Sequence, residues 1–240
     1  MSLAAAAGAI VALVGVEVII AATRDYLPTQ PALEIGGVFG PPDAPSLTLV
    51  VLGDSTAAGV GAGVPERAYP TLLAEGLSAE RRVSLVDFGV SGARVHDVLV
   101  DQAPRALAVD PDLLFVAIGG NDVTHLTWPG SVAADMDELL QTLAGTGAPI
   151  VVAGPPDMRV PAFPEPLRSI AGWYGRRIEG VIGDAARARG VSLVPLADET
   201  RAYFKERPET YYSSDLFHPS AAGYRKWAAA ILPLLREVAP

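Results

Sequence analysis

Short runs of apolar residues alternate with longer segments of helical periodicity along most of this chain. Each run is short and is followed by or ends at a glycine or proline, which is typical of buried strands. The runs are residues 47–52, 83–88, 113–118, 150–153 and 191–195. Helices are expected at residues 68–77, 94–107 (with a break at Pro104), 131–144, 170–189 and 221–238. Buried strands separated by helices predict an α/β fold, in which helices cover both faces of a mostly parallel sheet.

The pattern is different before the first strand. Residues 3–22 are apolar on every helical face and carry one charge, Glu17. A run of this length matches the roughly 20 residues that cross a bilayer core. We therefore expect a membrane-spanning signal-anchor helix within residues 1–23, with a cleaved signal peptide or a buried helix as the alternatives.

A segment rich in proline and glycine follows, at residues 24–45. Such a composition is typical of a semi-extended linker, so the globular domain is expected to span residues 46–240. An anchor followed by a spacer suits a domain outside the cytoplasm, or a secreted one if the first segment is cleaved. The abundance of Ala, Gly, Pro and Arg is associated with bacteria whose coding sequence is rich in GC.

Composition excludes several classes of partner and chemistry. The net charge is −9, and an acidic surface does not suit nucleic acid. The chain has no cysteine, which excludes disulfides, thiolate metal sites and a cysteine nucleophile. It also lacks a GxGxxG fingerprint and a P-loop lysine, so a flavin or nucleotide binder is disfavoured. No cofactor and no metal are expected.

Candidate chemistry lies directly after three of the expected strands. Ser55 follows the first strand, Gly92 the second and Asn121 the third. Parallel strands place their carboxyl ends at one edge of the sheet, where open α/β folds bind ligands. A hydroxyl, a glycine N–H and a side-chain amide there are the elements of a nucleophile and an oxyanion hole. Ser55 is also expected to begin a helix, so an ordinary N-cap is the alternative reading of this serine.

A serine nucleophile needs a base, and the chain has three histidines. His218 follows Asp215 by three residues, just before Pro219 and the last helix. At that spacing a carboxylate can contact the imidazole and fix its tautomer. His96 is expected at the surface, and His125 at the rim of a pocket.

These motifs occur in one order along the chain: GDS at residues 53–55, SG at 91–92, GGND at 119–122 and DLFHP at 215–219. Together they resemble the sequence blocks of the SGNH subgroup of the GDSL esterase/lipase family, over about residues 46–240. The resemblance implies a flavodoxin-like three-layer α/β/α sandwich. It also implies hydrolysis of an ester through a serine acyl-enzyme.

The resemblance assigns a role to each matching position. Ser55 matches the nucleophile, His218 the base and Asp215 the residue that orients the base. The N–H groups of Ser55 and Gly92 and the side chain of Asn121 match the oxyanion donors. The chain departs from the pattern at Thr56, in place of the usual leucine, and at Asp87, near a position where the family often has asparagine.

The sequence therefore predicts a carboxylic ester hydrolase, either an esterase/lipase or a carbohydrate O-deacylase. An acyltransferase using the same site and a catalytically dead, membrane-tethered binding protein remain as alternatives. The expected partners are a small-molecule, lipid or carbohydrate ester and, through the N-terminal helix, a membrane. Residues 154–166 should lie over the crevice, and the expected contacts of an acyl group are Met158, Phe163, Trp128 and Tyr174.

Overall fold

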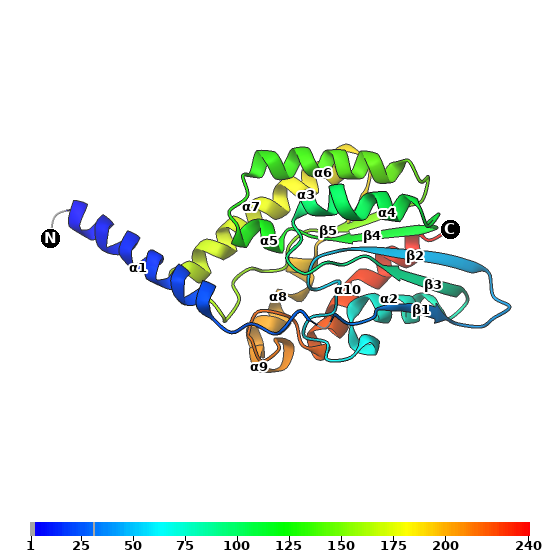
Figure 1. Ribbon diagram of the computed structural model, residues 1–240, viewed down its shortest axis with the longest axis horizontal. Coiled ribbons are helices and arrows are strands. Elements are labelled where there is room, and N and C mark those ends of the chain that lie inside the picture. The colour runs from blue at the N-terminus through cyan, green and yellow to red at the C-terminus, as the bar shows by residue number, and fades with distance from the viewer. Residues whose placement is uncertain (1–2, 31) are drawn as a thin grey trace.

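The computed structural model describes residues 3–30 and 32–240, and in this part of the chain six strands form one sheet (Figure 1). The strands are β1 (Gly36–Phe39), β2 (Ser46–Gly53), β3 (Arg82–Asp87), β4 (Leu113–Ala117), β5 (Ile150–Ala153) and β6 (Ser192–Val194). The described α-helices are α1 (Leu3–Thr23), α2 (Tyr69–Leu77), α3 (Val95–Asp97), α4 (Ala103–Leu107), α5 (Gly120–Thr124), α6 (Pro129–Ala144), α7 (Leu167–Ala188), α8 (Leu196–Glu206), α9 (Pro208–Tyr211) and α10 (Ala221–Val238). A 3₁₀ turn, η1 (Pro65–Arg67), and a π-helical turn, η2 (Val98–Gln102), complete the elements.

The sheet is mixed, with the order β1-β3-β2-β4-β5-β6. Strands β2 to β6 are parallel to one another, and their spatial order is second, first, third, fourth, fifth, which is a doubly wound arrangement. Gly53 at the end of β2 is paired with Ala117 at the end of β4, and Ala117 with Ala153 at the end of β5. The loops that follow these strands therefore leave the same edge of the sheet.

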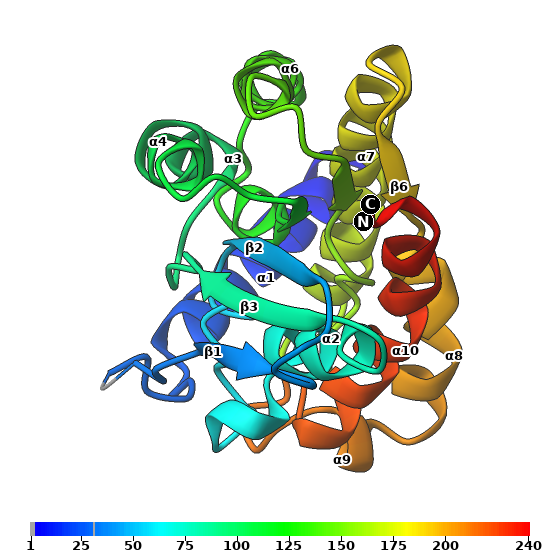
Figure 2. The same ribbon diagram turned by 90° about the vertical axis from the view of Figure 1, so that its right-hand side faces the viewer.

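Helices cover both faces of the sheet, as the apolar strands predicted. Figure 2 shows α4, α6 and α7 on one face and α2, α8 and α10 on the other. Strand β4 is buried at every position, since it lies in the middle of the sheet between the two layers. The predicted α/β sandwich is confirmed.

Two local predictions differ from the structure. Residues 95–107 are helical, as predicted, but the irregularity is the π-helical turn η2 between α3 and α4, and Pro104 lies in the first turn of α4 rather than breaking the helix. Ser55 does not begin a helix, because residues 54–62 form successive turns. Gly59 and Gly61 have φ angles of +75° and +93°, which end any helical run before it can extend.

The segment expected to be a linker contributes to the sheet. Strand β1 lies inside residues 24–45 and pairs antiparallel with β3, with Gly36 opposite Val86. Leu33 and Ile35 pack against the core. Short strands rich in glycine give a weak pattern, because glycine has no side chain whose burial could alternate.

The N-terminal apolar run forms α1, which extends from the domain in Figure 1. A helix long and apolar enough to cross a membrane was not found among the described residues, so the predicted membrane-spanning anchor is not supported. The charged residue of this helix is instead used inside the protein. Glu17 is only 4% exposed, and its carboxylate accepts a hydrogen bond from the backbone N–H of Leu167 at 2.8 Å.

Candidate active site

Ser55 lies two residues beyond the end of β2, where the chain leaves the sheet. Its position is set from two sides. The side-chain amide of Gln102 accepts from Gly53 N–H at 2.9 Å and donates to the Gly53 carbonyl at 2.8 Å. After Ser55, the phenol of Tyr224 donates to the Val60 carbonyl at 2.5 Å. The tight loop that carries Ser55 is thus held by side chains from η2 and α10.

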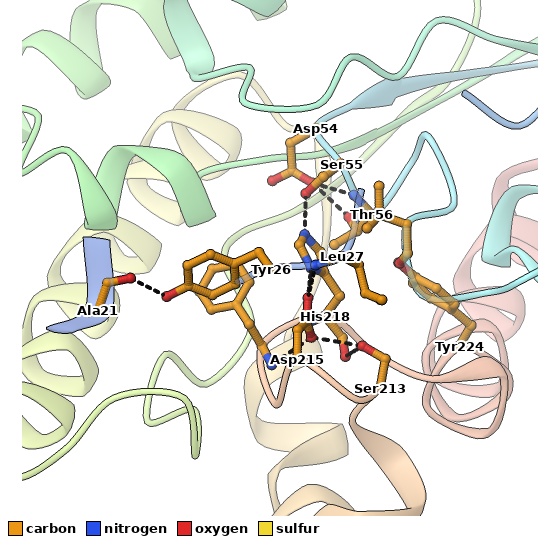
Figure 3. Close-up of polar contacts among 12 residues, drawn as sticks. Ala21, Tyr26, Leu27, Asp54, Ser55, Thr56, Ser213, Asp215, His218 and Tyr224 are labelled. Carbon is orange, nitrogen blue, oxygen red and sulfur yellow. Dashed lines mark hydrogen bonds and ion pairs between the residues drawn. The ribbon is translucent and has the colours of Figure 1, made fainter. Parts of the chain in front are cut away.

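Ser55, His218 and Asp215 form a continuous chain of hydrogen bonds (Figure 3). Nε2 of His218 lies 3.0 Å from Oγ of Ser55, and Nδ1 of His218 lies 2.6 Å from Oδ2 of Asp215. All three residues are less than a tenth exposed. The structure therefore brings together the three residues that the sequence predicted as nucleophile, base and orienting acid.

Asp215 is held as a carboxylate despite its burial. Oδ1 accepts hydrogen bonds from the backbone N–H groups of Phe217 and His218, both at 3.0 Å, and from the hydroxyl of Ser213 at 2.8 Å. Burial alone would raise the pKa of Asp215, but these bonds and the one from the imidazole outweigh it and hold the pKa well below its usual range. An ionised Asp215 can stabilise an imidazolium on His218.

Two of the predicted oxyanion donors, Gly92 and Asn121, lie on neighbouring segments that are bonded together, the loop after β3 and the short helix α5. The side-chain amide of Asn121 donates to the Ala93 carbonyl at 3.0 Å, and the carboxylate of Asp122 accepts from Val95 N–H at 3.1 Å. Gly92 has a φ of +87°, a region that favours glycine. An amide nitrogen carries two N–H groups, so Asn121 can hold this loop with one and donate to a ligand with the other.

A cavity of about 490 Å³ opens beside these residues. Ser55, Gly92, Asn121 and His218 all line it, so the predicted nucleophile, base and oxyanion donors face one space. Most of the remaining wall is apolar and comes from α1, α5 and α7. A smaller cavity of about 50 Å³ lies next to it, also lined by Ser55 and His218.

The four expected acyl contacts lie in three different places. Phe163 and Tyr174 line the large cavity, whereas Met158 lines the smaller one and is buried. Trp128 is 73% exposed and is the N-cap residue of α6, outside both cavity walls. Sequence position alone placed Trp128 near the mouth, but its side chain does not line the cavity.

The remaining titratable candidates are placed as follows. Asp54 accepts from both the backbone N–H and the hydroxyl of Thr56, at 2.9 and 2.8 Å, and also lines the smaller cavity. Burial raises the pKa of Asp54. His125 is exposed and lines the large cavity, and His96 contacts Asp135 on the surface.

Three partners of the site were not predicted from the sequence. They are Gln102, Ser213 and the backbone N–H of Leu27, which donates to Oδ2 of Asp215 at 3.2 Å. Ser213 lies two residues before Asp215, and a serine so close to an expected catalytic acid could have been noticed. In the part of the chain that the structure describes, no group of three His, Asp or Glu side chains is placed to hold a metal ion.

A doubly wound α/β sheet with Ser55, His218 and Asp215 bonded in series at its carboxyl edge is typical of serine hydrolases. Comparison with known proteins agrees with this class. Residues 51–226 match the GDSL-like lipase/acylhydrolase family, so the chain belongs to that family. The resemblance predicted from the four motifs is therefore confirmed.

A curated relative is a GDSL-like esterase of Mycobacterium tuberculosis, 34% identical over 194 residues. The match covers 79% of this chain and 62% of the relative, so the chain spans about three fifths of the relative's length.

Two solved structures share the fold. An α/β hydrolase enzyme from the metagenome of Lake Arreo, Spain, is 24% identical with a TM-score of 0.67, covering 80% of this chain and 96% of its own. A phospholipase A1 from Streptomyces albidoflavus NA297 is also 24% identical, with a TM-score of 0.64, covering 80% of this chain and 99% of its own.

Proposed function

We propose that this protein hydrolyses carboxylic esters through a covalent acyl-enzyme on Ser55. The observation that carries the proposal is the series of two hydrogen bonds from Ser55 Oγ to His218 at 3.0 Å and from His218 to Asp215 at 2.6 Å. A serine hydroxyl is a weak nucleophile until an adjacent base removes its proton.

In the first step, Ser55 Oγ attacks the ester carbonyl carbon and its proton passes to Nε2 of His218. The carbonyl oxygen becomes an oxyanion, which the N–H groups of Ser55 and Gly92 and the Asn121 amide would stabilise. The tetrahedral intermediate collapses when the bond to the leaving alcohol breaks. His218 gives its proton to that alcohol oxygen, and the acyl group remains on Ser55.

In the second step, water attacks the acyl-enzyme. His218 takes a proton from the water, the same donors hold the second oxyanion, and the bond to Ser55 Oγ breaks. The proton on His218 returns to Ser55, which releases the carboxylic acid. Asp215 stays ionised throughout and stabilises the imidazolium that forms in each step.

The cavity favours esters of apolar acids. Apart from the predicted catalytic residues and a few polar side chains such as Thr29 and Thr124, its walls are formed largely by aliphatic and aromatic side chains such as Val123, Phe163 and Ile170. An apolar acyl group would lose water-exposed surface on entering it, which is favourable for binding. The relative described as an esterase and the solved phospholipase A1 are consistent with an ester substrate.

Hydrolysis of p-nitrophenyl acetate by the wild-type protein and by Ser55→Ala tests the proposal. We expect the wild-type protein to release p-nitrophenol and the variant to lose essentially all activity. Ser131→Ala, which removes an exposed hydroxyl from α6, is the matched control and should behave as wild type. Equal activity of the wild-type protein and Ser55→Ala would show that the nucleophile is assigned incorrectly. An inactive wild-type protein that binds the ester would favour a dead binding protein.

The location of the domain outside the cytoplasm stays a prediction, and it rests on the N-terminal apolar run. Proteolysis of intact bacterial cells expressing the full chain tests it. Cleavage of the domain by added protease before the cells are lysed would support the prediction. Protection until lysis, under conditions that cleave a known external protein, would contradict it.

A further inference from the structure

Residues 17–30 cross the active site, and we refer to them as the N-terminal strap. They comprise the end of α1 and the extended segment after it, and they precede the residues that match the family. We propose that the N-terminal strap forms one wall of the substrate cavity and selects esters with an extended apolar acyl chain. This inference rests on the proposed ester hydrolysis at Ser55.

The strap is fastened at its beginning to the helix opposite it. The carboxylate of Glu17 accepts a hydrogen bond from the backbone N–H of Leu167, the first residue of α7, at 2.8 Å. The first N–H groups of a helix have no partner within it, and a negative charge at that end is stabilised by the helix dipole. The single charge of an otherwise apolar segment therefore has a defined partner on the cavity wall.

The strap is fastened at its other end to the catalytic acid itself. The backbone N–H of Leu27 donates to Oδ2 of Asp215 at 3.2 Å, the same oxygen that accepts from the imidazole (Figure 3). The ring of Tyr26 packs edge-on against Phe217, with ring centroids 5.3 Å apart, and its hydroxyl donates to the Ala21 carbonyl at 2.9 Å. This last bond closes the turn between α1 and the extended segment.

Between the two attachments the strap presents apolar side chains to the cavity. Val18, Ala21 and Tyr26 line it from the strap, and Leu167 and Ile170 line it from α7. The cavity volume of about 490 Å³ falls within the range of small-molecule sites. Without the strap, the cavity would lose one of its apolar walls.

The chemistry of this wall determines what can bind there. A carbonyl attacked by Ser55 lies next to Ser55, Gly92 and Asn121, and the same cavity gives a chain attached to it room between the strap and α7. Methylene groups gain free energy when they leave water for such a surface. Sugar hydroxyls would lose hydrogen bonds to water without finding donors or acceptors on these side chains. The wall therefore favours an acyl chain over a carbohydrate.

The test compares two esters in the full-length protein. The kcat/KM of p-nitrophenyl octanoate divided by that of p-nitrophenyl acetate measures the preference for a long acyl chain. Both esters need the same catalytic residues, so the ratio does not depend on the chemical step that they share. Val18→Trp should fill part of the cavity beside the strap, and Val18→Ser should make this wall more polar without adding bulk. Val16→Trp is the matched control, because Val16 is on the same helix, similarly exposed, and outside the cavity wall.

We expect both Val18 variants to lower the octanoate-to-acetate ratio roughly tenfold, the scale of selectivity in an apolar pocket, and Val16→Trp to leave it unchanged. A ratio equal to that of wild type in both Val18 variants would overturn the inference while leaving ester hydrolysis intact. A ratio that falls equally in Val16→Trp would also overturn it. Failure of the proposed function is recognised separately, because Ser55→Ala would then retain activity on both esters.

Discussion

The side-chain amide of Gln102 makes two hydrogen bonds with the backbone of Gly53, at 2.9 and 2.8 Å. Gln102 is 1% exposed and lies on the π-helical turn, 49 residues away in sequence. Gly53 is the last residue of β2 and precedes Ser55 by two positions. A buried amide thus completes the hydrogen bonding of the strand end at the point where the nucleophile's loop begins.

We predict that Gln102→Leu lowers the free energy of unfolding by about 1–3 kcal/mol, because it leaves the buried Gly53 N–H without a partner. Urea unfolding followed by circular dichroism measures this change. Gln141→Leu, a substitution of the same kind at an exposed position on α6, should change stability by less than about 0.5 kcal/mol. Equal effects of the two substitutions would contradict the role given to Gln102.

Asn121→Ala should reduce kcat about 10²–10³-fold, with a much smaller change in KM. An oxyanion donor acts on charge that develops in the transition state, so its loss affects the chemical step more than binding. Steady-state kinetics on p-nitrophenyl acetate separates the two parameters. A rise in KM at unchanged kcat would place Asn121 in substrate binding instead.

We predict that the free energy of unfolding depends on pH because of Asp87. Its Oδ1 is buried without a hydrogen-bond partner in the described part of the chain. Burial raises the pKa of Asp87 to about 8, despite a hydrogen bond from Gly89 and the nearby Arg105. The residue is therefore mostly protonated in the folded protein at neutral pH, and it then resembles the asparagine that the family often has nearby.

The direction in which pH changes the free energy of unfolding follows from proton linkage. Between the unfolded pKa of about 4 and the folded pKa of about 8, the folded state binds more protons. Asp87 should therefore lower the free energy of unfolding as pH rises, by up to about 1.4 kcal/mol per pH unit. Asp87→Asn should remove this contribution, which urea unfolding at pH values near 5 and 8 measures. Asp43→Asn at an exposed position is the control, and an unchanged slope in Asp87→Asn would refute the prediction.

Local motifs predicted that Ser55, His218 and Asp215 lie close together, and the structure shows their contacts. Asp215 and His218 are close in sequence, so their contact follows from one turn, and Ser55 and Asn121 follow neighbouring parallel strands whose ends must meet. The fold class followed from buried strands between helices. These features depend on residues near one another in sequence or on a general rule of sheet topology.

Long-range partners could not be predicted in the same way. Glu17 contacts Leu167 across 150 residues, and Leu27 contacts Asp215 across 188. An apolar helix that packs on a domain has the same composition as one that enters a membrane. The sequence of residues 3–22 therefore could not show which of the two kinds of helix it forms. Only the three-dimensional arrangement shows that the charge in this helix is bonded within the protein.

Labelling by a fluorophosphonate probe tests the central claim most directly, because such a probe reacts covalently with an activated serine. The full-length protein is treated with the probe, and intact and peptide mass spectrometry locate the adduct. We predict one probe per chain, attached to Ser55, and much slower labelling in His218→Gln because the base that activates the hydroxyl is missing. An adduct at another residue, or labelling of Ser55 that is equally fast in His218→Gln, would contradict the account.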